Sequence, residues 1–329
     1  MTRLIDEITS FLESEGVECS RQVRDGVDVI CATTPEGRRP RVILPLEIAA
    51  ASVEEAAASS GRAYECAVSV RSIEGAPVIV TEDRWHSQNA MTRSRILAHL
   101  EVFRQAFARN CEVRRIEKTE ARDFLNVNHS YGYAACRYHY GLFLKRQTGH
   151  LADEAWPAPG SLIAVATFSN ARRWIKGERE IRSYEWTRYA SLPGLRINGG
   201  MGKMLKTFID EVHPDDIMSY ADLEWSEGDV YSQLGFALEG QKEPVMFSVD
   251  TRTWERSPVK PGMTGLVKPG MTGLVKPGMT GLVRPGMTGL VRPEMTDPAG
   301  EAVIPGSAGN LFFRNFGSNK YRLKLTDYQ

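Results

Sequence analysis

A glycine-rich turn offers the clearest chemistry in this sequence. It reads Arg196-Ile197-Asn198-Gly199-Gly200-Met201-Gly202-Lys203, and the apolar spacing after it predicts a helix over 200–212. Glycines let a backbone approach an anion closely, and a helix N-terminus offers free N–H groups and a positive dipole end. The turn therefore has the chemistry of a phosphate cradle. A tight strand-to-helix connection explains the same glycines as well, and the turn matches neither GxxxxGK[ST] nor GxGxxG.

Three other side chains could move protons. Tyr231 lies on a helix predicted over 226–234, either as an acid or as a half-buried helix aromatic. Asp222 ends a predicted strand. It could orient an amine or accept its proton, or it could form a salt bridge or serve as a helix N-terminal carboxylate. His129 lies in a polar and aromatic loop. Since histidine titrates near neutrality, it could be a general base or a structural hydrogen-bonding group.

Charged residues elsewhere in the second half leave further alternatives. On a strand predicted over 182–190, Glu185 or Arg188 could face a cleft, and an ion pair of Arg188 is the other interpretation. A basic loop with one aromatic residue spans 172–176. Such a loop suits phosphate contact and base stacking, and a solvated loop is the plainer interpretation.

Several short motifs in the region 82–250 recur in an order typical of one family. They are Glu82-Asp83-Arg84-Trp85, Phe124-Leu125-Asn126-Val127-Asn128-His129, Gly199-Gly200-Met201-Gly202-Lys203-Met204-Leu205-Lys206, Ser219-Tyr220-Ala221-Asp222 and Tyr231-Ser232-Gln233-Leu234-Gly235-Phe236. This run resembles the GNAT-like acyltransferase domain found in phage and bacterial proteins, often behind a homing-endonuclease-type nuclease. It is also similar to phage Mom-type proteins, which modify adenine in DNA.

The resemblance implies an α/β (α+β) fold with a GNAT-like mixed sheet and packed helices, preceded by a small α+β N-terminal domain. It implies acetyl-CoA or another acyl-CoA as co-substrate. The residues expected to bind it are Arg196, Asn198, Gly199, Gly200, Met201, Gly202 and Lys203. Tyr231 would protonate the leaving thiolate, and Asp222 or His129 would prepare the acceptor amine. The acceptor could be a nucleobase amine, which would make DNA a partner, or a protein or small-molecule amine. Met201 departs from the family consensus Q/R-x-x-G-x-G/A, which has a small residue there.

The order of the elements predicts five segments. Residues 1–84 form a small α+β accessory domain, which could be a degenerate nuclease-like unit. Residues 85–110 form a connector helix, and 111–257 form the GNAT-like domain. Near-identical octapeptides of the type Val-Lys-Pro-Gly-Met-Thr-Gly-Leu make 258–297 a flexible insert, because Pro and Gly oppose a regular helix. Residues 298–329 form a C-terminal hairpin that completes the GNAT-like domain.

In the N-terminal half, periodicity predicts strands and helices in alternation. Strands are expected over 26–32, 41–48, 66–72 and 76–81, and helices over 52–59 and 91–107.

The composition limits the classes of function. Lys plus Arg and Asp plus Glu are equal at 41 each, so no whole-chain field draws the protein to nucleic acid or membrane. The five cysteines are scattered without CxxC pairs, which favours reduced thiols and no metal site. No long apolar run occurs, and a cytoplasmic protein is expected.

The alternative function is a non-catalytic nucleic-acid-binding module derived from a mobile-element protein. A metal-dependent nuclease is a third hypothesis, disfavoured because Glu47-Ile48-Ala49 lacks the required Lys.

Overall fold

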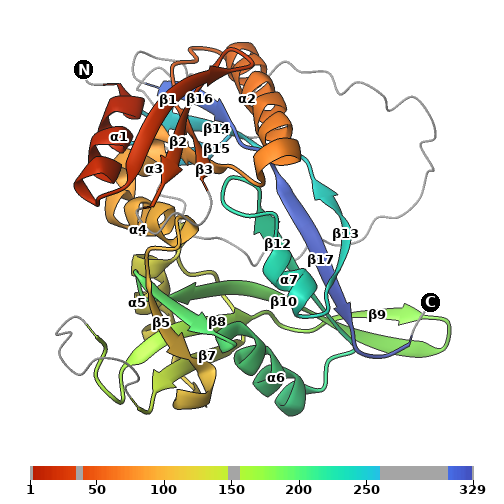
Figure 1. Cartoon of the computed structure of the whole chain (residues 1–329). Coiled ribbons are helices and arrows are strands. Elements are labelled where there is room, and N and C mark those ends of the chain that lie inside the picture. The colour runs from red at the N-terminus through yellow and green to blue at the C-terminus, as the bar shows by residue number, and fades with distance from the viewer. Residues whose placement is uncertain (1–2, 35–39, 147–155, 260–309, 328–329) are drawn as a thin grey trace, which may run out of the picture.

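The computed structural model describes residues 3–34, 40–146, 156–259 and 310–327. The octapeptide segment predicted over 258–297 therefore lies outside the described residues, apart from its first two residues. Figure 1 shows the N-terminal elements at the top of the molecule and the sheet of the second half below them. Among the described residues, no helix is long and apolar enough to cross a membrane.

The N-terminal unit is a four-stranded sheet in the order β1-β2-β3-β4, and only the β3–β4 pair is parallel. The strands are β1 (Glu18–Arg24), β2 (Val27–Thr33), β3 (Arg41–Leu46) and β4 (Val78–Thr81). Alternate strand residues face opposite sides. One face packs on α1 (Leu4–Ser14) and α4 (Asn89–His99), and the other packs on α2 (Val53–Glu74). This unit is the small α+β layer that the sequence predicts.

The prediction of a strand over 66–72 is wrong, because α2 continues to Glu74. The helix begins with Ser52, whose side chain accepts from the Glu55 amide at 3.1 Å. Its buried residues Ala63, Cys66, Ala67 and Val70 follow the i, i+3, i+4, i+7 spacing of a single helical face. Small and polar residues alternate over 66–72, and this pattern is typical of a strand. The segment is helical because one side of the helix packs on the sheet.

The prediction of one helix over 91–107 is also wrong. The span holds α4, which follows the short α3 (Glu82–Ser87), and then strand β5 (Arg104–Phe107). The chain leaves α4 through Glu101, whose φ of 63° is left-handed. β5 pairs in parallel with β11 (Leu195–Asn198), and this pair carries the start of the glycine-rich turn.

The second half is built on a sheet whose strand order is β13-β17-β12-β10-β8-β7-β6, with β9 paired to β10. The strands are β6 (Cys111–Arg115), β7 (Tyr138–Leu144), β8 (Leu162–Phe168), β9 (Arg172–Lys176), β10 (Arg179–Ser191), β12 (Asp216–Asp222), β13 (Ala237–Lys242) and β17 (Ser318–Lys324). Helix α5 (Lys118–Asn128) covers one face, and α6 (Gly200–Val212) covers the other. The short α7 (Asp229–Gln233) lies between β12 and β13 in the chain.

The C-terminal strands do not form the predicted hairpin. β16 (Asn310–Arg314) joins β14 (Met246–Asp250) and β15 (Arg256–Pro258) in a separate three-stranded sheet. β17 instead lies between β12 and β13 in the large sheet. Figure 1 shows the small sheet beside the N-terminal unit, and Ala50 forms an isolated bridge with Phe312. The C-terminal residues thus complete the large sheet and also bind it to the N-terminal unit.

Candidate functional site

The site forms where two parallel strands separate. β10 and β12 pair only over Ser183–Glu185 with Asp216–Met218. Beyond that point β10 pairs only with β8, with a register shift that leaves Thr187 without a partner, while β12 stays with β17. The gap between the strands is a cavity of about 820 Å³, which is within the usual range for ligand sites.

The glycine-rich turn opens into this cavity. Gly199 has a φ of 76°, a left-handed conformation that suits glycine. A Cβ on Gly200 would lie 2.9 Å from the Ile197 side chain, so the helix start packs directly on β11. No side chain caps α6, and the first N–H groups of a helix have no partner inside it. The turn therefore presents free amides and the positive end of a helix dipole to the cavity.

Most of the residues expected to hold acyl-CoA line this cavity. They are Arg196, Asn198, Gly199, Gly200, Met201 and Gly202. Arg196 is exposed and stacks on Phe103, and Met201 packs partly against the core of the sheet. Lys203 lies elsewhere, because its Nζ donates to the carbonyls of Ala108 at 2.9 Å and Cys111 at 2.6 Å. The Lys203 ammonium therefore anchors the helix to the preceding chain and is not among the residues that face the cavity.

Tyr231 lines the cavity from α7, close to the point where the strands separate. The buried Ser219 hydroxyl donates to the Trp186 carbonyl at 2.9 Å and lies 2.8 Å from the Tyr231 hydroxyl. A serine has one hydroxyl proton, so with that proton on the carbonyl the Ser219 oxygen accepts from Tyr231. Burial raises the pKa of Tyr231. The phenol is therefore protonated at neutral pH and able to donate.

Asp222 also lines the cavity, but its carboxylate is occupied. Oδ2 accepts from the Tyr131 hydroxyl at 2.9 Å and lies 3.5 Å from Arg84 Nη2. Oδ1 accepts from the Glu224 amide at 3.0 Å. These contacts match the salt-bridge alternative better than the role of a proton acceptor.

His129 faces the same cavity in a state that makes it a poor base. Its Nδ1 accepts from the Tyr131 amide at 3.1 Å, so the lone pair is engaged. Burial, followed by the charges of Arg188, Arg95 and Arg84, lowers the pKa of His129 to about 3. The ring is neutral at neutral pH and carries its proton on Nε2, and the structure favours the hydrogen-bonding alternative.

The cavity also contains charged residues beyond the expected catalytic and cofactor-binding set. Glu185 lines it at the separation point, and among the described residues its carboxylate has no hydrogen bond or ion pair. Arg95 of α4 and Arg188 of β10 also line it. The sequence predicts that Glu185 or Arg188 faces a cleft, and both of them line this cavity. The sequence predicts no role for Arg95, because the apolar spacing of the predicted helix does not show what the polar side of that helix faces.

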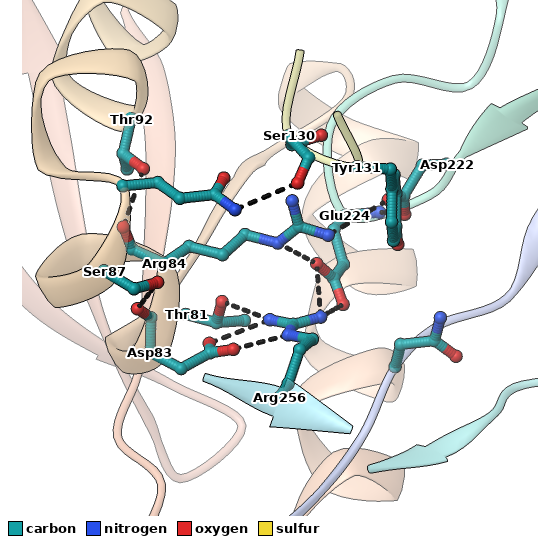
Figure 2. A network of polar contacts seen from close by, with 12 residues as sticks. Thr81, Asp83, Arg84, Ser87, Thr92, Ser130, Tyr131, Asp222, Glu224 and Arg256 are labelled. Carbon is teal, nitrogen blue, oxygen red and sulfur yellow. Dashed lines mark hydrogen bonds and ion pairs between the residues drawn. The ribbon is translucent and has the colours of Figure 1, made fainter. Parts of the chain in front are cut away.

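A buried ionic network lies beside Asp222, as Figure 2 shows. Arg256 of β15 binds Asp83 with two nitrogens and Glu224 with a third, at 3.0 Å to Oε1. Arg84 Nε lies 3.0 Å from the same Glu224, on Oε2. Burial raises the pKa of Glu224 even though both guanidinium groups oppose this. Burial also acts to raise the pKa of Asp83, but the hydrogen bonds and charge of Arg256 outweigh it and lower that pKa.

The basic segment 172–176 is not a loop. It is strand β9, paired with β10 as an edge strand, and all five of its residues are exposed. Lys176 lies over the Trp174 ring, with Nζ 5.5 Å from the ring centroid.

The mixed sheet with helices on both faces, preceded by a small α+β unit, confirms the mixed α/β fold class that the sequence predicts. No protein-family model matches the chain, and no curated protein matches it. Among solved structures it is similar to Eis1 from Mycobacterium abscessus, with 15% identity and a TM-score of 0.30. The match covers 43% of this chain and 34% of Eis1, so the chain spans about a third of that protein's length. A likeness this low supports no conclusion about activity, and the fold class is read from the sheet itself.

Proposed function

We propose that the protein is an acyl-CoA-dependent N-acyltransferase. One observation carries the proposal: a single cavity is lined both by the uncapped N-terminus of α6 and by the protonated Tyr231. The helix N-terminus suits a pyrophosphate. The phenol suits a leaving thiolate, which needs a proton.

The residues at the separation point supply a complete transfer step. The acceptor amine attacks the thioester carbonyl, the new C–N bond forms, and the C–S bond breaks. Tyr231 gives its proton to the departing sulfur, and the Ser219 hydroxyl can then turn to stabilise the phenolate. The backbone amide of Thr187, which has no opposite residue on β8 at the register shift, would donate to the oxyanion. Glu185, whose carboxylate has no hydrogen bond or ion pair among the described residues, takes the proton that the amine loses. This places the base on Glu185 rather than on Asp222 or His129.

Acetyl-CoA binding tests the proposal through Gly202, which lines the cavity in the first turn of α6. A Cβ there meets only the end of Leu234, at 3.2 Å, whereas Gly200 has no such room. Gly202→Asp leaves the fold intact, since an acid in the first turn favours the helix, but it repels a pyrophosphate. We expect calorimetry to show saturable binding to wild type, reduced at least about tenfold in Gly202→Asp. The neutral Gly202→Asn is the matched control and keeps most of the affinity. Absence of saturable binding to wild type excludes the proposal.

The acceptor is proposed to be a nucleobase amine, which the Mom-type resemblance supports. DNA incubated with the protein and acetyl-CoA, then digested to nucleosides, should yield an acetylated base by mass spectrometry. An unmodified nucleoside pool, together with release of CoA from acetyl-CoA when other amines are supplied, would assign the activity to a protein or small-molecule acceptor.

The exposed strand β9 favours a second candidate, a nucleic-acid-binding module without catalysis. Its arginines and Trp174 could contact phosphates and stack on bases. This candidate predicts binding of a labelled single-stranded DNA that weakens steeply with salt and depends on Arg172 and Arg173. It also predicts no saturable acetyl-CoA binding, which separates it from the acyltransferase.

A further inference from the structure

Three arginines and two aromatic rings alternate at one side of the cavity, and we name them the arginine ladder. Arg95 lies over the Trp225 ring, with 4.8 Å from the guanidinium carbon to the ring centroid. Arg84 lies between Trp225 and Tyr131, at 5.8 Å and 4.8 Å from their centroids. Arg188 lies over Tyr131 at 6.0 Å. The rings separate three like charges and offer each cation a π face.

The charges of the ladder are compensated unevenly. The central Arg84 contacts the carboxylates of Glu224 and Asp222, and Figure 2 shows it inside the buried network. Among the described residues, neither Arg95 nor Arg188 has an ion pair. The hydrogen bonds of Arg188 go to the carbonyls of Gly132 at 3.0 Å and Thr187 at 2.9 Å. Both outer arginines line the cavity, whereas Arg84 does not.

The outer arginines keep their charge in this setting. Burial and the nearby Arg84 lower the pKa of Arg95 only to about 10, with Asp222 acting in the opposite direction. Burial lowers the pKa of Arg188, and Cys136 and Glu185 oppose this. A cation removed from water without a contacting carboxylate is unfavourable, and an anionic ligand relieves that cost. Neutral His129 adds a donor beside them, because its proton is on Nε2.

We propose that Arg95 and Arg188 bind an anionic group, a phosphate or a carboxylate, on the acyl acceptor. This inference deepens the proposed function and rests on it for the identity of the bound molecule as an acceptor. Guanidinium groups recognise both anions through paired N–H donors. The acceptor is then an amine that carries its own negative charge, and Glu185 and Tyr231 lie in the same cavity as its reacting nitrogen.

The test uses amines in pairs that differ only in the anionic group. Phosphoethanolamine is compared with ethanolamine, and β-alanine with β-alaninamide, at saturating acetyl-CoA with release of the CoA thiol as the readout. We expect kcat/KM to be at least about tenfold higher for the charged member of one pair, and the pair that responds distinguishes phosphate from carboxylate. Arg95→Gln and Arg188→Gln should remove this preference by raising KM for the amine, with KM for acetyl-CoA changed less than about twofold.

Arg93→Gln is the matched control on the same helix. Arg93 is exposed, and its guanidinium carbon lies 4.7 Å from the centroid of the Phe11 ring in the N-terminal core. Its variant should keep the wild-type preference.

Three results overturn the inference. The first is equal activity on both members of both pairs. The second is a preference that survives in Arg95→Gln and Arg188→Gln. The third is a preference lost together with acetyl-CoA affinity, which would assign the arginines to the phosphates of CoA.

Failure of the proposed function is recognised separately, by calorimetry without turnover. If wild type does not bind acetyl-CoA, phosphoethanolamine and β-alanine are titrated directly. Saturable binding of either that is lost in Arg95→Gln supports an anion site independent of acyl transfer. Absence of saturable binding to wild type overturns that site too.

Discussion

In the proposed mechanism, Tyr231 has the most specific chemical role of the residues that line the cavity. Its hydroxyl has Ser219 as a partner, and Ser219 has the Trp186 carbonyl as its own. Tyr231→Phe keeps the ring and its packing on Trp186 and Tyr321, and it removes only the hydroxyl group with its proton. We expect kcat for acyl transfer to fall about 100-fold, with KM for acetyl-CoA changed less than about twofold. Steady-state kinetics measures both, and an unchanged kcat would remove Tyr231 from the mechanism.

His129 predicts a pH dependence of stability. Its folded pKa is about 3, below the ordinary value of 6.5. Between these pH values the unfolded chain binds a proton that the folded chain does not. The contribution of neutral His129 to the unfolding free energy is therefore fully present above about pH 6.5 and is lost as the pH decreases. His129→Asn keeps an acceptor for the Tyr131 amide and removes the titration. The unfolding free energy of the variant, relative to that of wild type, should therefore increase as the pH falls to about 4.5. The increase is at most about 1.4 kcal/mol per pH unit. Denaturant titrations at several pH values measure this, and parallel curves for the two proteins would contradict it.

At the scale of elements, the chain changes sheets at Gly317, between β16 and β17. Its φ is 78°, and a Cβ there would lie 2.2 Å from the Lys242 carbonyl oxygen. A backbone atom cannot rotate aside, so Gly317→Ala combines left-handed strain with a steric clash. Gly177, in the turn between β9 and β10, has a φ of 61° and nothing within 4 Å.

These two glycines form a matched pair. Gly177→Ala should lower the unfolding free energy by about 1 kcal/mol, the cost of the backbone conformation alone. Gly317→Ala should cost about 2 kcal/mol more. Equal effects in chemical denaturation would show that the passage between the sheets adapts to a side chain.

For the whole molecule, the network around Arg256 joins three parts of the chain. Asp83 comes from the N-terminal unit, Glu224 follows β12 of the large sheet, and Arg256 belongs to the small sheet. The Asp83 and Glu224 side chains are both only 1% exposed. The loss of Arg256 therefore leaves Asp83 without an ion pair among the described residues and leaves Arg84 as the one cation that contacts Glu224 there.

Arg256→Met should therefore lower the unfolding free energy by about 3–5 kcal/mol. The control is Arg252→Met on the same connection, since Arg252 is 86% exposed and pairs with Asp250 at the surface. That change should cost less than about 1 kcal/mol. Denaturant unfolding of the intact chain measures both changes. If Arg256→Met lowers the unfolding free energy by less than about 1 kcal/mol, the network does not hold the N-terminal unit, the large sheet and the small sheet together.

The sequence alone determined the local features of this protein. Some patterns depend only on residues that are close together in the sequence. These are the glycines at the start of α6, the apolar spacing of that helix and the alternation in the strands. The turn, the helix and most strands of the second half were therefore predictable. The alternation of strands and helices along the second half was also enough to predict a mixed α/β sheet with packed helices.

Only the tertiary structure decided what these residues touch. It bound Lys203 to backbone carbonyls, paired Asp222 with Tyr131 and Arg84, and surrounded His129 with arginines. It also placed β17 inside the large sheet and left β16 outside it. The physical reason is the distance along the chain: Arg256 and Asp83 are 173 residues apart. Periodicity records which side of an element is buried, but it does not record the partner that buries it, and the charge of each site residue depends on that partner.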